Sequence, residues 1–422
     1  MMTREAIEQL KPFQARVIIE GLRKGIVPTE YVSFFTVGRQ NWLTFVEEDL
    51  DCFIAEGGGK VRFINGDYGD GKTHFMSIIQ QLALQKNFAS SFVVLTREIP
   101  IHKFEVVYQE IVSKVRGSFE GVGIRPLIQH WINKQKTAEE NFGQLSTFLR
   151  QMPGMDLSFA NALLGLLQLN TASSSEEEEE REDSQEILYQ WFEGKKVAKK
   201  DLKRFHVFET LNKTNSKQFL QSLVAFLKLT NHKGLIVLLD ELEIVLAQGA
   251  SIRNAAYENV RLLMDHTEHT QYLQLFFSLI PDVLLAEKGF KSYDALWSRV
   301  RTVGNSETVN YRGTLVDLHK TPLKLQELID LGVSLRKIHE ISYRWNAQQA
   351  ISNDLIAEMC EKQEEMGVLS EVRLFIKQMV RFLDEAEQGK PMDETHLLNN
   401  LLESRKETEI EKTRQLEPAW DA

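Results

Sequence analysis

The sequence predicts an α/β protein in which helices surround a parallel β-sheet, and three observations support this fold class. Two runs, 235–239 and 273–280, are almost wholly apolar and as short as strands, which is typical of strands covered on both faces. A glycine-rich segment at 66–73 separates a strand-like stretch from a helical one. Over most of the remaining chain, apolar residues recur at helical spacing.

The N-terminal part predicts two helices before the first strand. Residues 5–24 carry apolar side chains every three or four positions, with Pro12 at a first turn or a kink and Gly25 at the end. Residues 42–55 repeat the pattern until three consecutive glycines stop it. Strands are then expected at 61–64, 92–95, 235–239, 273–280 and 315–318. Helices are expected at 73–85, 255–263, 323–331, 351–359 and 372–383, with a charged, fraying helix at 403–422.

The long stretch between the second and third strands looks mainly helical. A crossover between parallel strands needs about 30 residues, so 104–232 is a much longer insertion than the connection requires. Within it, the low-complexity, acidic residues 172–184 should form a disordered loop, because like charges repel and bury nothing. The expected domains are a helical segment at 1–35, a core at 36–320 and a helical C-terminal domain at 321–422.

Composition excludes several classes of protein. The 422 residues are 43% hydrophobic and 26% charged, which is ordinary for a globular chain and too apolar for a mostly disordered one. Two distant cysteines give neither a zinc motif nor a disulfide framework. With no apolar run near 18 residues and no signal-like N-terminus, we expect no membrane span and a cytoplasmic protein.

The segment Gly66, Asp67, Tyr68, Gly69, Asp70, Gly71, Lys72 and Thr73 matches the phosphate loop G-x-x-x-x-G-K-[S/T] at every fixed position. Its glycines let backbone N–H groups turn towards phosphates, and the following helix adds its dipole. Lys72 should reach the β- and γ-phosphates, and the Thr73 hydroxyl should bind Mg²⁺. The loop therefore predicts a site for ATP and Mg²⁺.

The strand 235–239 runs into Asp240 and Glu241, which has the form of a Walker B motif. Asp240 would hold Mg²⁺, and Glu241 would polarise the attacking water. Glu243 lies close by in sequence, but we favour Glu241 for this role. The pair makes the chain a candidate ATPase as well as a nucleotide-binding protein.

Further polar residues fit accessory roles. Ser278, in the next apolar strand, could orient the water as a sensor 1 residue, or be a buried hydroxyl bonded to backbone. Arg299 or Arg301 could act as an arginine finger on a neighbouring subunit, or be a surface arginine. Arg373, at the start of a C-terminal helix, fits either a sensor 2 residue or a helix-face salt bridge.

The order of phosphate loop, Walker B motif, polar strand and helical C-terminal region resembles the AAA+ ATPases, especially their origin-recognition and STAND-like branches. Residues 36–40 look like the V-G-R-E box of those branches, in which Gly38 and Arg39 belong to a segment that helps enclose adenine, with Gln40 in place of the acid. A closer resemblance is to the ATP-binding, BrxD-like family of the BREX phage-defence systems. The matching stretches are 15–25, 36–40, 61–73, 235–241 and 372–375.

This resemblance implies an AAA+-like P-loop NTPase with a helical lid or winged-helix-like domain at its C-terminus. It also implies action in defence against foreign DNA, together with other proteins of the defence system and in a homo-oligomer. We expect an ATPase, stimulated by DNA or a partner, that remodels a DNA-associated complex. The alternative is a regulatory switch whose ATP and ADP states present different surfaces with little turnover. A small-molecule kinase fits less well, because such kinases are usually more compact.

Charge is segregated along the chain. The formal net charge is −10, yet 176–183 alone carries a net −6. A nearby cluster has a net +5 and is the best local candidate for binding double-stranded DNA, although a solvated helix face would look the same. Its bases are Lys195, Lys196, Lys199, Lys200, Lys203 and Arg204. The neighbouring acids could compete with DNA for this cluster.

Overall fold

The computed structural model describes residues 5–137, 142–171, 178–301, 308–365 and 371–390. The chain divides into two compact units, and it passes between them several times. The first unit draws on Met1–Asn41, Gly66–Ile78 and Asp317–Ala422, and the second on Trp42–Asn65 and Ile79–Val316. Residues 1–35, which we expected to form a segment of their own, therefore group with C-terminal helices, and the change of unit at Asp317 lies close to the expected boundary at 320.

The second unit is built on a five-stranded sheet in the order β2-β3-β4-β1-β5. The pairs β1–β4, β3–β4 and β2–β3 are parallel. The strands are β1 (Gly59–Asn65), β2 (Ala89–Val94), β3 (Leu235–Asp240), β4 (Leu273–Leu279) and β5 (Leu315–Asp317). All five strands occur where the sequence predicts them, and β4 lies between β1 and β3.

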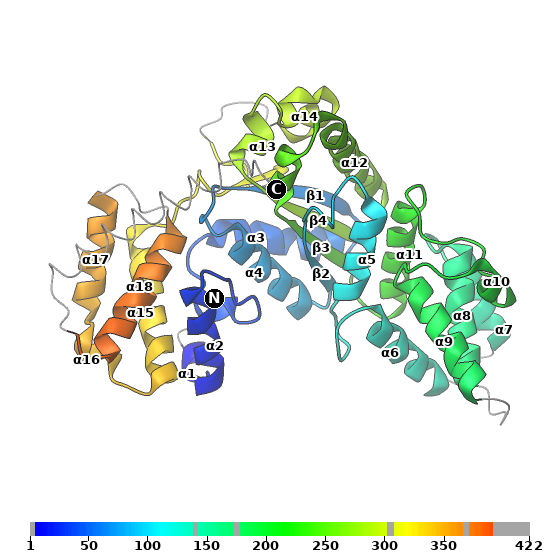
Figure 1. Ribbon diagram of the computed structural model, residues 1–422, viewed down its shortest axis with the longest axis horizontal. Coiled ribbons are helices and arrows are strands. Elements are labelled where there is room, and N and C mark those ends of the chain that lie inside the picture. Colours follow the sequence, from blue (N-terminus) through cyan, green and yellow to red (C-terminus); the bar gives the residue numbers. More distant parts are fainter. Residues whose placement is uncertain (1–4, 138–141, 172–177, 302–307, 366–370, 391–422) are drawn as a thin grey trace, which may run out of the picture. The chain divides into compact units, whose positions relative to one another are not determined.

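The central strands are apolar because helices cover both faces of the sheet (Figure 1). Every residue of β3 and β4 is buried. One face packs Phe63, Val237 and Phe277 into the main hydrophobic core. The helices that contribute to this core include α5 (Phe104–Lys114), α11 (Ser216–Leu229) and α12 (Ala250–His269). Further elements of this unit are α3 (Gln40–Asp49), which continues as a π-helical turn at Leu50–Ile54, α13 (Pro281–Leu285) and α14 (Asp294–Val300).

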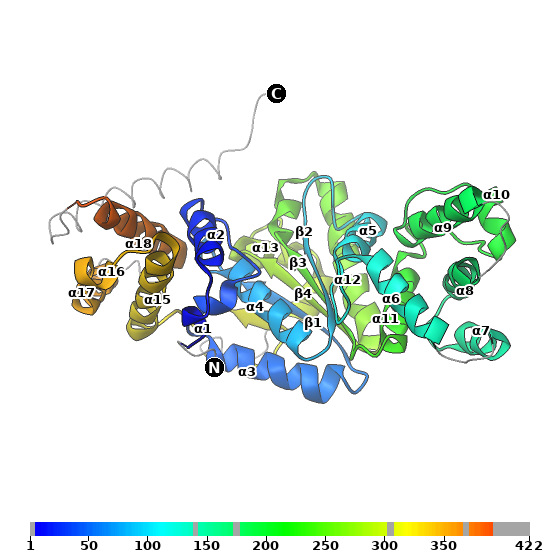
Figure 2. The same ribbon diagram turned by 90° about the horizontal axis from the view of Figure 1, so that it is seen from below.

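The expected insertion is helical, as predicted, and its helices gather beyond one end of the sheet (Figure 2). They are α6 (Ile124–Thr137), α7 (Phe142–Gln151), α8 (Leu157–Thr171), α9 (Glu178–Phe192) and α10 (Lys199–Leu202), between α5 and α11. Aromatic side chains form their core, with the Phe159 and Phe192 rings 4.9 Å apart and the Trp191 and Phe219 rings 5.3 Å apart.

The start of α9 corrects one expectation. We expected a disordered loop over 172–184, but the structure has a helix from Glu178, while 172–177 lie outside the described residues. Three glutamates occupy the first turn of α9, where the helix dipole favours negative charge. Leu188 and Trp191 anchor the other end of the helix in the core. Burial of that end therefore outweighs the repulsion among the acids.

The described residues of the first unit are helical apart from its loops. Pro12 occupies the first position of α2 (Pro12–Arg23), where its missing N–H costs nothing. The α2 helix packs against α15 (Leu325–Tyr343) and α18 (Val372–Glu387). Other helices here are α1 (Glu5–Glu8), α16 (Ala347–Ala350), α17 (Asn353–Glu365) and the first half of α4 (Lys72–Gln85). The expected helix at 403–422 lies outside the described residues.

Among the described residues, no helix is both long enough and apolar enough to cross a membrane.

Candidate nucleotide-binding site

The glycine-rich segment 66–73 follows β1 directly and leads into α4. Gly69 and Gly71 have φ angles of +97° and +87°, which residues with a Cβ rarely adopt. A Cβ on Gly71 would meet no atom nearer than His74 Cβ at 4.0 Å, so the space beside this glycine is open. The segment thus combines a strand, a glycine turn and a helix N-terminus, which is the local structure that a phosphate cradle needs.

Lys72 folds back over this loop. Its Nζ donates to the carbonyl oxygens of Gly66 at 3.0 Å and Asp67 at 3.2 Å, and the residue is only 7% exposed. The ammonium also lies 5.2 Å from the ring centroid of Tyr68. The lysine charge is therefore held at the loop itself, as binding of phosphates would require.

Asp70 braces the loop from within. Its Oδ2 accepts the N–H of Asp67 at 2.7 Å. The Nε2 atom of His319 lies 3.4 Å from a carboxylate oxygen of Asp67 and 3.6 Å from one of Asp70. Burial raises the pKa of Asp70, although the Asp67 N–H and His319 oppose the rise. His319 is a part of this site that sequence reasoning missed, because nothing near residue 319 marks it.

Arg39 ties three segments of the first unit together. Its guanidinium donates to the carbonyl oxygens of Leu318 at 3.2 Å, Thr321 at 3.1 Å and Asp70 at 3.1 Å. Burial lowers the pKa of Arg39 to about 10, which still leaves the side chain charged at neutral pH. The sequence motif predicted that Arg39 belongs to the nucleotide site, and the structure brings it to the phosphate loop as a bracing residue.

Gly38 suits its position. Its φ is +67°, a conformation that favours glycine, and a Cβ there would lie 2.5 Å from Leu323 Cδ2 and 2.8 Å from Glu327 Oε2. A larger residue at this position would therefore have to displace these two side-chain ends. The 36–40 segment therefore lies close to Leu323 and Glu327 because Gly38 has no side chain. The long side chain of Arg39 binds the same segment to Asp70, Leu318 and Thr321.

His74, the residue after Thr73, packs under the same segment. Its Nε2 lies 2.9 Å from Thr36 Oγ1, whose single hydroxyl hydrogen is donated to Val32 O at 2.7 Å. The Nε2–H of His74 must then be the donor in the first of these hydrogen bonds. Burial, with Arg39 nearby, lowers the pKa of His74 to about 4. A neutral histidine thus joins the first turn of α4 to the 36–40 segment, and its position directly after the loop was the only sequence signal for it.

Arg373 also comes to the loop. Its Nη2 donates to Gly25 O at 3.0 Å, and its Cβ would lie 3.4 Å from a Cβ placed on Gly69. The first turn of α18 therefore passes beside the glycine turn. The structure brings Gly66–Thr73, Gly38, Arg39 and Arg373 into one neighbourhood within the first unit.

A second group of predicted residues meets within the second unit, where β3 and β4 end. Asp240 and Ser278 are both buried. The Ser278 hydroxyl donates to Asp240 Oδ1 and accepts the N–H of Glu241 at 2.9 Å. Glu241 has a left-handed backbone with φ of +66°, so the chain turns sharply after Asp240. Glu241 is half-buried, whereas Glu243 is 6% exposed and belongs to the following 3₁₀ turn.

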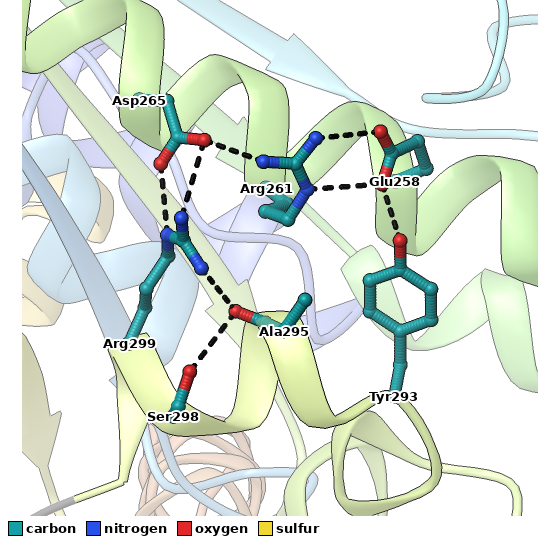
Figure 3. Close-up of polar contacts among 7 residues, drawn as sticks. All are labelled: Glu258, Arg261, Asp265, Tyr293, Ala295, Ser298 and Arg299. Carbon is teal, nitrogen blue, oxygen red and sulfur yellow. Dashed lines mark hydrogen bonds and ion pairs between the residues drawn. The ribbon is translucent and has the colours of Figure 1, made fainter.

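Arg299 is engaged within its own chain (Figure 3). Its Nε donates to Asp265 Oδ1 at 2.8 Å, and its Nη1 donates to Ala295 O at 2.5 Å. Asp265 also binds Arg261, which pairs in turn with Glu258. An arginine finger at this position would have to leave this network, whereas Arg301 is exposed just after α14.

The predicted basic cluster lies on the surface. All six of its side chains are exposed, on α10 and the segments beside it. Lys195 pairs with Glu193 at 2.7 Å, and Arg204 Nη2 donates to Ser184 Oγ at 2.6 Å on α9.

A comparison with known protein families finds one match. The model of one protein family, described as BREX system ATP-binding protein BrxC/D, matches residues 10–401, which is nearly the whole chain. No curated protein matches the chain closely enough to be considered related.

Proposed function

The chain belongs to the family of BREX system ATP-binding proteins BrxC/D, and from this premise we propose that it is an ATPase. The family suggests ATP binding and a role in phage defence, with other components of the system as partners. The proposal adds that ATP is hydrolysed, and that hydrolysis drives the remodelling of a DNA-associated complex.

One observation carries the proposal of hydrolysis. A buried serine orients both residues of a carboxylate pair, since Ser278 donates to Asp240 and accepts the N–H of Glu241. Nucleotide binding alone does not need an acidic residue after the Mg²⁺ ligand. In the proposed mechanism, Thr73 and Asp240 would be the ligands of Mg²⁺, Lys72 would contact the β- and γ-phosphates, and Glu241 would accept a proton from the attacking water. Arg373 would contact the nucleotide as sensor 2, and Gly38 and Arg39 would border the base.

Two variants test this mechanism in the purified full chain. Glu241→Gln should lower Mg²⁺-dependent phosphate release by about 10²- to 10⁴-fold, the usual contribution of a general base, while ATP affinity stays within twofold. Lys72→Ala should abolish ATP binding itself. Glu243→Gln is the matched control, because it changes a carboxylate two residues away and should leave turnover nearly intact. If Glu241→Gln hydrolyses ATP at the wild-type rate, the proposal is wrong.

A slow nucleotide switch is the second candidate, and the Arg299 network favours it. With Arg299 bound to Asp265, this arginine would first have to leave an ion pair before it could act on a neighbouring nucleotide. Turnover should then be low until a partner, DNA or a further protomer releases it. Strong stimulation by double-stranded DNA would favour the remodelling ATPase. Partner affinity that depends on nucleotide, without turnover, would favour the switch.

A further inference from the structure

An unusual surface lies in the helical insertion, where the segment that follows α10 packs on α8 (Figures 1 and 2). Residues 203–208 combine basic, aromatic and apolar side chains in the order Lys203, Arg204, Phe205, His206, Val207 and Phe208. Phe208 is 60% exposed, which is a large apolar area to leave in water, and His206 is exposed as well. We call this segment, with Arg150 and Leu157, the 203–208 surface.

The backbone of this segment is fixed from below by α8. Ser158 Oγ accepts the N–H groups of Phe208 at 3.3 Å and Glu209 at 3.2 Å. Asn161 Nδ2 donates to His206 O at 2.9 Å, and this helps hold His206 in a left-handed conformation with φ of +56°. The Phe208 and His206 rings are 6.5 Å apart and inclined by 62°. Two rings are thus presented to solvent from a braced backbone.

Basic side chains lie on this segment and on the helices that support it. Arg204 lies over the neighbouring Phe205 ring at 4.8 Å, and Arg150 donates to Asn161 Oδ1 at 2.9 Å, the side chain that also binds His206 O. Four more bases, Lys195, Lys196, Lys199 and Lys200, are exposed in the segment just before. Between residues 195 and 208, Asp201 is the single acid. The partner of this surface should therefore be a polyanion with flat, apolar faces.

We propose that the 203–208 surface binds single-stranded nucleic acid, with bases stacked on Phe208 and His206 and with Arg204, Arg150 and the lysines at the phosphates. A duplex hides its base faces in its own stack, so it offers only phosphates to this surface. A single strand offers both, and aromatic residues within a positively charged groove are the usual means of binding it. A braced backbone lowers the ordering cost of binding. The proposal deepens the proposed function, because it rests on the DNA-associated role stated there.

Fluorescence anisotropy with the full chain, without nucleotide, tests the proposal. The probes are a 20-nucleotide thymidine strand and a 20-base-pair duplex. Phe208→Ala should weaken binding of the single strand at least about fivefold, since one stacked base contributes about 1–3 kcal/mol. Binding of the duplex should change less than twofold. Phe208→Tyr, which keeps the ring, should restore affinity for the single strand.

Two controls sharpen the result. Phe13→Ala removes another exposed phenylalanine, from α2 in the first unit, and should change neither affinity. Lys199→Glu with Lys200→Glu should weaken both probes and flatten the dependence of affinity on salt. The proposal is overturned if the wild type does not bind the single strand, or if Phe208→Ala affects both probes equally. Because no ATP is present, these outcomes are independent of whether the chain hydrolyses ATP.

Discussion

At the scale of single residues, Ser278 has two hydrogen-bond partners, and both belong to the proposed catalytic pair. Ser278→Ala should lower ATP turnover about tenfold with little change in ATP affinity, because Asp240 and the Glu241 backbone lose their common support. Ser91→Ala is the matched control. Ser91 is equally buried in β2, but its hydroxyl donates to Ile111 O at 3.0 Å, away from the carboxylates. Each variant should lose about 1 kcal/mol of stability, but turnover that falls equally in both would contradict this role of Ser278.

His74 makes stability depend on pH. Its pKa is about 4 in the folded chain, well below the value of about 6.5 expected when unfolded. The unfolded chain therefore binds a proton that the folded chain excludes, so the free energy of unfolding is highest above about pH 6.5 and falls towards pH 4. His74→Gln keeps an N–H donor for Thr36 but cannot titrate. The melting temperature of this variant should fall less than that of the wild type between pH 6.5 and 4.5. If both melting temperatures fall by the same amount, His74 is not the source of the pH dependence.

At the scale of elements, Arg23 joins α2 to α18. Its Nε and Nη2 donate to the two carboxylate oxygens of Asp384 at 2.9 and 2.7 Å, and Nη2 also donates to Tyr343 at 2.9 Å. His339 Nε2 lies 3.0 Å from Asp384 Oδ1. Burial alone would raise the pKa of Asp384, but hydrogen bonds from His339 and Arg23 outweigh it and lower the pKa.

Arg23→Lys should therefore destabilise the first unit by about 1 kcal/mol, because lysine keeps the charge but loses the two-pronged contact. The site is about one-third exposed, which keeps the effect moderate. Lys337→Ala provides the control, since it removes an exposed pair with Glu8 and should cost less than about 0.5 kcal/mol. Thermal unfolding followed by circular dichroism compares the two variants. An equal loss of stability would show that the geometry of Arg23 is unimportant.

The strands were the most predictable elements, and the reason is physical. A strand buried on both faces must be apolar throughout, so the runs 235–239 and 273–280 can be recognised as strands from the sequence. The phosphate loop was predictable because its φ angles demand glycine at fixed positions. The start of α9 could not be predicted from the sequence, because Leu188 and Trp191 anchor the far end of this helix through tertiary packing. Nor could the contacts of Arg39 and His74 be predicted, because they join residues 31 to 282 positions apart.

At the scale of the whole molecule, the net charge of −10 is the sum over regions of opposite charge, one acidic and one basic. The acids at the start of α9 lie on the helix that binds Arg204 through Ser184, so they share a neighbourhood with the basic cluster. Deleting 173–184 would remove buried Ser184, so a gentler test is Glu178→Gln, Glu179→Gln and Glu182→Gln together. This variant should bind nucleic acid severalfold more tightly at 50 mM salt, with the gain shrinking at 500 mM as the charges are screened. Unchanged affinity at low salt would dismiss competition by these acids.

The repeated passage of the chain between its two units has a consequence for protein synthesis. The phosphate loop leaves the ribosome long before His319, Thr321 and Arg373, which brace it or lie beside it. By contrast, the sheet from β1 to β4 can assemble as soon as residue 279 has emerged. The strands that carry the carboxylates can thus pair first, whereas the phosphate loop gains these neighbours only after Arg373 has emerged. A nascent chain would accordingly hold a paired sheet before the surroundings of its phosphate loop are complete.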